Sequence, residues 1–127
     1  MQNLPAEHDD PRVVPQDGGL DLTAAQQRLG NDDELLREMA RIVVQDTPGL
    51  LEQVASGLNA TDVEPACRAA HSLKGLTSNF SESAAAAALA VEQALHSGDA
   101  DRIQKSVAVL AGWVERLNSE LQRTVLQ

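Results

Sequence analysis

Aromatic residues are almost absent from this sequence. Its 127 residues include no tyrosine, one phenylalanine and one tryptophan. A fold of six or more strands is not expected, because sheets are normally enriched in aromatic and β-branched side chains. Hydrophobic residues still make up 43% of the chain, so alanine, leucine and valine must pack the core. The length and composition therefore predict a single all-α domain.

The chain also lacks a cysteine pair and a long apolar run. Cys67 is the single cysteine, so no disulfide can form within the chain and a reducing compartment is expected. No run of 18 apolar residues is present, and the N-terminus has no basic-then-apolar signal pattern. These absences predict a cytoplasmic protein that does not enter a membrane.

Positive charge is scarce as well. The sequence has ten lysines and arginines and 19 aspartates and glutamates, which gives a net charge of −9. Nucleic acids and anionic membranes both require a basic surface, so neither is expected as a partner. A small local cationic patch remains possible around Arg68, His71 and Lys74.

The apolar spacing predicts four long helices after a short one. Residues 1–19 hold three prolines and little periodicity, and we interpret them as a disordered leader or linker before a domain over 20–125. A short helix is expected over 21–29. A longer one should follow from a cap at Asn31. Its expected apolar stripe is Leu35, Met39, Ile42, Val43, Leu50, Val54 and Leu58.

Pro48 interrupts this stripe, and Thr47 could cap a separate helix there. Because the stripe keeps its register across the proline, we favour one kinked helix.

The remaining three helices are bounded by recognisable turn and cap residues. Thr61 or Asp62 should cap a helix that ends near residue 79. Ser81 or Ser83 should cap the next helix, and Asp99 should cap the last one. The last helix carries an apolar seam at alternating spacings of four and three, with Trp113 beside it and expected to be half exposed. Short connections predict an antiparallel up-down-up-down four-helix bundle with a short extra N-terminal helix.

One stretch, residues 69–80, places polar residues on the outer face of its helix. Ala66, Ala70, Leu73, Thr77 and Phe80 share the core face, whereas His71, Lys74, Gly75 and Ser78 share another. An ordinary surface histidine beside a surface lysine would explain most of this pattern. Gly75 favours a functional interpretation, because a glycine inside a helix costs roughly 1 kcal/mol relative to alanine. We infer a need for space beside His71.

These residues resemble the signature of histidine-containing phosphotransfer (HPt) domains. The likeness rests on His71-x-x-Lys74-Gly75, with Ala69-Ala70 before it and Asn79-Phe80 after it. It extends from about Leu22 to Leu121. Ser81-Glu82 departs from the family, which usually has a glycine soon after the asparagine-aromatic pair. HPt domains are four-helix bundles that carry a phosphoryl group in bacterial and eukaryotic phosphorelays.

The resemblance implies a role for each residue on this face. His71 would accept the phosphoryl group on its distal ring nitrogen, Lys74 would approach the phosphoryl oxygens, and Gly75 would leave room for a partner. Arg68, Cys67 and Ser78 are assigned to the surrounding docking face, although Cys67 is more readily explained as a small helix residue than as a reactive thiol. The partners would be a response-regulator receiver domain and a sensor histidine kinase, with this chain a monomer.

The sequence contains no Gly-rich phosphate-binding loop and no other nucleotide motif. The chain would therefore be a phosphocarrier and not an enzyme with its own ATP site. No cofactor or metal is expected in it, and the Mg²⁺ of the transfer would belong to the receiver domain.

Two alternatives remain open from the sequence. The chain could be a helical interaction module, or a degenerate HPt domain that acts as a scaffold or inhibitor. An enzyme with a metal in the bundle core is less favoured, because the inward positions are apolar.

Overall fold

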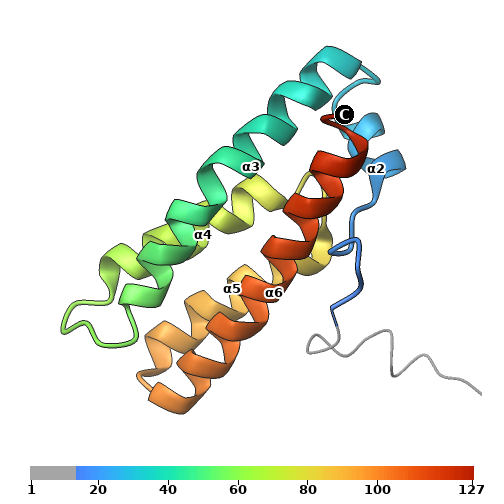
Figure 1. Cartoon of the computed structure of the whole chain (residues 1–127). Coiled ribbons are helices and arrows are strands. Elements are labelled where there is room, and N and C mark those ends of the chain that lie inside the picture. Colours follow the sequence, from blue (N-terminus) through green and yellow to red (C-terminus); the bar gives the residue numbers. More distant parts are fainter. Residues whose placement is uncertain (1–13) are drawn as a thin grey trace, which may run out of the picture.

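The structure is a computed structural model that describes residues 14–127, and all of its regular secondary structure in this range is helical. Helices α3 to α6 form an antiparallel four-helix bundle in which each helix contacts two neighbours, and α2 lies at one end of it (Figure 1). The predicted fold is confirmed. In the described range no helix is long and apolar enough to cross a membrane. The helices are α2 (Leu22–Arg28), α3 (Asp33–Ser56), α4 (Glu64–Thr77), α5 (Glu82–Ser97) and α6 (Ala100–Thr124).

Two of the predicted helix caps are confirmed. The side chain of Ser81 accepts a hydrogen bond from the backbone of Ala84 at the start of α5, and Asp99 caps α6 in the same way. These side chains satisfy backbone N–H groups that have no partner within the helix.

The caps predicted for the two preceding helices are wrong by one or two residues. Asp32 caps α3 in place of Asn31, because Asn31 adopts a left-handed backbone conformation with φ of 58° and belongs to the turn. Val63 occupies the cap position of α4, and its side chain makes no capping bond. The predicted Asp62 still accepts a hydrogen bond from the backbone of Glu64.

Helix α3 continues through Pro48 as one helix, as its apolar spacing predicted. The buried stripe differs from the predicted one, because Leu35 and Leu58 are exposed and Leu36 and Ala40 are buried instead. Thr47 also lies in the core. Its hydroxyl donates to the carbonyl of Val43 at 2.7 Å and accepts a hydrogen bond from the Asn118 amide of α6 at 2.8 Å. These bonds allow a polar side chain to be buried beside the proline.

The segment before α2 packs against α6. Ser81 donates a hydrogen bond to the carbonyl of Gly18, and a side chain at Gly19 would meet the Trp113 ring at 3.0 Å. Trp113 is therefore buried, with 5% of its surface exposed, and the expectation that it would be half exposed is wrong. Residues 14–19 of the predicted leader contact the bundle, whereas residues 1–13 lie outside the described range.

Alanine makes up many of the buried positions on α4 and α5, two helices that contact each other extensively. Ala66, Ala69 and Ala70 are buried on α4. Ala84, Ala87, Ala88 and Ala94 are buried on α5. Because the distance between two helix axes depends on the side chains between them, these alanines let the two backbones lie close together. This packing sets which α5 residues stand beside the outer face of α4.

The bond between Thr47 and Asn118 predicts a stability change. Thr47→Val keeps the shape of the side chain but leaves the half-buried Asn118 amide without this acceptor, so the free energy of unfolding should fall by about 1–3 kcal/mol. Thr124→Val is a matched control, because the Thr124 hydroxyl makes the same kind of bond to the carbonyl of Glu120 on the exposed surface. Urea unfolding measures both. Equal losses in the two variants would contradict a structural role for the bond between Thr47 and Asn118.

Candidate functional site

The outer face of α4 carries the histidine that the sequence singled out. The residues predicted to share the core face of this helix are all buried: Ala66, Ala70, Leu73, Thr77 and Phe80. His71 lies on the opposite side, and 69% of its side chain is exposed. Because the buried stripe fixes the rotation of α4, the imidazole is held at the surface of the bundle.

Glu92 of α5 stands directly beside the histidine. Its Oε1 lies 3.5 Å from His71 Nδ1, which is an ion-pair distance and the outer limit of a hydrogen bond. The Glu92 side chain is only 21% exposed, and this oxygen is buried without a hydrogen bond to any described residue. A carboxylate in this position favours a proton on Nδ1 and leaves the lone pair of Nε2 free.

A shallow hollow of about 380 Å³ surrounds this pair. Arg68 is exposed at its edge, where its guanidinium lies 4.0 Å from Glu64 one turn earlier on α4. His96 comes from α5, one turn after Glu92. The hollow is lined by Glu64, Cys67, Arg68, His71, Ser72, Glu92 and His96. Across residues 14–127 no three histidine, cysteine, aspartate or glutamate side chains are grouped closely enough to hold a metal ion.

Cys67 does not belong to an exposed docking face, and its assignment there is wrong. Only 5% of its surface is exposed, because it lies on the edge of the buried stripe at the wall of the hollow. Burial raises the pKa of its thiol, and the negative charges of Glu64, Glu92 and Asp62 raise it further. A buried thiol with a raised pKa forms little thiolate at neutral pH, so Cys67 has the properties of a packing residue.

The other residues predicted on this face remain at the surface. Gly75 is exposed, and a side chain built on it would meet nothing within 4 Å. Lys74 is half-buried and forms no ion pair with any described residue. Ser78 is exposed and donates a hydrogen bond to the carbonyl of Gly75 at 3.0 Å. A cationic side chain therefore stands one helical turn from His71, with open space beside it.

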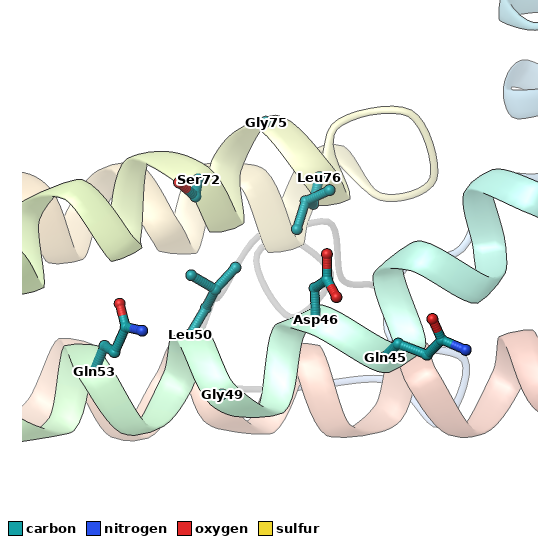
Figure 2. Close-up of a pocket in the computed structure, with 8 residues that line it drawn as sticks. All are labelled: Gln45, Asp46, Gly49, Leu50, Gln53, Ser72, Gly75 and Leu76. Carbon is teal, nitrogen blue, oxygen red and sulfur yellow. The ribbon is translucent and has the colours of Figure 1, made fainter.

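The exposed outer face of α4 forms a ridge, the α4 ridge, with the hollow around His71 on one side. A second depression lies on its other side. This α3–α4 groove has a volume of about 720 Å³, and Figure 2 shows that Leu50 of α3 and Leu76 of α4 project into it from opposite walls. Ser72 lines both this groove and the hollow around His71. The groove is lined by Gln45, Asp46, Gly49, Leu50, Gln53, Ser72, Gly75 and Leu76.

The turn that follows α4 is fixed by α2. Arg28 donates hydrogen bonds to the carbonyls of Ser78 and Asn79, and its guanidinium lies 3.7 Å from Glu82. The Arg28 guanidinium thus satisfies free carbonyls at the C-terminal end of α4. Ser81 and Glu82, which replace the usual glycine of the resembled family, both take part in holding this turn.

Sequence reasoning missed Glu92 and the α3 wall of the groove. Glu92 could not be paired with His71 from the sequence, because the register between α4 and α5 cannot be read from spacing. A signal was present, since Glu92 is an acidic residue on an otherwise alanine-rich helix. On α3, the signal was Gly49, a second glycine inside a helix, directly after Pro48.

Comparison with known proteins assigns the family. No curated protein and no solved structure matches the chain. The family model described as the Hpt domain matches residues 38–124, which include α4 and the outer face with His71. Because this match covers more than half of the sequence, the chain belongs to the Hpt domain family.

Proposed function

We propose that this protein accepts a phosphoryl group on Nε2 of His71 and exchanges it with the aspartate of a response-regulator receiver domain. Membership of the Hpt family gives it a phosphotransfer role in phosphorelays, as a carrier module and not a catalytic enzyme. The single observation that carries the residue assignment is the exposed His71 ring with its Nδ1 beside the Glu92 carboxylate.

The proposed transfer needs little from this chain besides a positioned nucleophile. The Nε2 lone pair attacks phosphorus, the bond between phosphorus and the aspartyl oxygen breaks, and that oxygen leaves as carboxylate with the electron pair. The proton on Nδ1 stays in place, and the ring becomes cationic as the new bond forms. Glu92 lies beside Nδ1 and would stabilise this charge, while the partner would supply Mg²⁺ for the phosphoryl oxygens.

Lys74 would act on the phosphorylated state. The chain carries a net charge of −9, so two further negative charges on a phosphohistidine would be repelled by the protein as a whole. The Lys74 ammonium has no other ionic partner among the described residues, and from one turn away it can approach the phosphoryl oxygens.

The source of the phosphoryl group must lie outside this chain, since the sequence has no nucleotide-binding motif. A sensor histidine kinase and a receiver domain are therefore the proposed partners, and the carrier is proposed to be a cytoplasmic monomer. The alternative of a scaffold or inhibitor without transfer is separated from this proposal by a labelling experiment.

The first prediction concerns the phosphorylation site. Phosphoramidate is a small phosphodonor, so it should label the protein without a docked partner, as its P–N bond breaks and ammonia leaves. His71→Gln should abolish this acid-labile label and leave the circular dichroism spectrum unchanged. His8→Gln and His96→Gln, which replace the other two histidines, should label as the wild type does. Label retained in His71→Gln would refute the assignment, and an unlabelled wild type would favour the scaffold alternative.

The second prediction concerns Glu92 as a positioning residue. Glu92→Ala should shift the His71 tautomer away from Nδ1–H, which ¹⁵N-detected NMR reports, and slow labelling by roughly threefold to tenfold, equivalent to about 0.7–1.4 kcal/mol in the barrier. Glu92→Gln should restore part of the rate, because its amide oxygen can still accept a hydrogen bond from Nδ1–H. Glu64→Ala removes another carboxylate from the same hollow and should leave the tautomer unchanged. Identical spectra in Glu92→Ala and the wild type would contradict this role.

The third prediction separates Lys74 from the fold. Lys74→Ala should melt within a few degrees of the wild type, because a lysine near the surface seldom contributes more than about 1 kcal/mol. Its phosphohistidine should form more slowly or hydrolyse faster, since a charge-assisted contact of roughly 1.5–3 kcal/mol before screening is lost. The control is Lys105→Ala, which removes the other lysine, ion-paired with Asp101 on α6. Equal phosphoryl half-lives in all three proteins would make Lys74 an ordinary solvated side chain.

A further inference from the structure

The α3–α4 groove is open because two helices lack side chains where they border it. Gly49 of α3 and Gly75 of α4 both line it, and a side chain built on either would meet nothing within 4 Å. Glycine inside a helix is less stable than alanine, and no packing contact at either position requires it. The two glycines therefore keep this space open although alanine would make both helices more stable.

The lining of the groove defines the chemistry of what it can hold. Leu50 and Leu76 are half-buried and project into the groove from opposite sides, so its centre is apolar (Figure 2). The Asp46 carboxylate points toward α4 beside them and forms no ion pair with any described residue. Gln45 and Gln53 add polar groups along the α3 side. The groove suits an apolar side chain that has a cation or hydrogen-bond donor next to it.

The position of the groove connects it to the phosphorylation site. Ser72 lines both the groove and the hollow around His71, so the two depressions meet on the α4 ridge. A typical specific interface covers about 800 Å² on each partner, a patch roughly 30 Å across. Neighbouring helix axes lie only about 8–10 Å apart. A protein that closes over His71 with an interface of this size therefore covers the groove as well.

We propose that the α3–α4 groove is the specificity contact for the protein that exchanges phosphoryl with His71. This inference rests on the proposed function. The partner presents its acidic phosphoacceptor site to His71, and beside that site it inserts an apolar side chain between Leu50 and Leu76. A cation or donor next to this side chain pairs with Asp46. Gly49 sets the depth of the groove, so α3 contributes to partner choice although it carries no phosphoryl chemistry.

The test compares one side chain placed in two grooves. Gly49→Gln fills the α3–α4 groove with a residue that favours helix. Ala90→Gln places the same side chain in the apolar groove of about 590 Å³ between α5 and α6, which does not include His71. Each variant and the wild type are labelled on His71 with phosphoramidate, and transfer to isolated receiver domains is followed under single-turnover and steady-state conditions. Melting curves confirm that both variants are folded.

The expected result is labelling at the wild-type rate in both variants, with kcat/KM for transfer lowered at least tenfold in Gly49→Gln alone, mainly through KM. Gly49→Ala, whose added carbon leaves most of the groove open, should transfer nearly as the wild type does. Transfer by Gly49→Gln at the wild-type rate, or equal losses in Ala90→Gln, would overturn the groove proposal and leave the proposed function intact. A wild-type dimer that Gly49→Gln converts to monomer would assign the groove to a second copy and also overturn it. A wild-type protein that takes no label would overturn both.

Discussion

The packing of α4 against α5 is the constraint on which the site depends. Both helices bury several alanines and contact each other extensively, and their packing brings Glu92 to 3.5 Å from His71. Larger side chains between the two helices would move the carboxylate away from the ring, and the Nδ1–H tautomer would lose its acceptor. The small residues that look least informative in the sequence thus help to hold Glu92 beside His71.

Helix α4 has a buried face that packs in the bundle and an exposed face that carries His71. Its buried stripe ends in Leu73 and Thr77 and is followed by the buried Phe80 of the next turn, and these residues fix its rotation in the bundle. Its outer ridge separates a polar hollow on the α5 side from an apolar groove on the α3 side. His71 lies on this ridge, with a different surface on either flank. If the proposed transfer takes place there, a partner can be selected by contacts that take no part in the chemistry.

Hydrogen bonds from polar side chains join the elements around this ridge. The bond between Thr47 and Asn118 joins α3 to α6 beside Pro48, where the helix lacks one backbone donor. Arg28 and Ser81 tie α2 and the preceding segment to the turn after α4. Hydrogen bonds between elements distant in sequence thus hold the bundle beside α3 and the turn that follows α4.

The sequence by itself determined the helices, the rotation of α4 and the exposure of His71, because these follow from local apolar spacing and from cap residues such as Ser81 and Asp99. It also predicted the continuous helix through Pro48 and the family to which the chain belongs. Only the tertiary structure decided the contacts between elements. Cys67 and Trp113 are buried because of what packs over them, and Glu92 meets His71 because of the register between two helices. Side-chain periodicity records which face of a helix is apolar, but it carries no information on which residue of a neighbouring helix lies opposite.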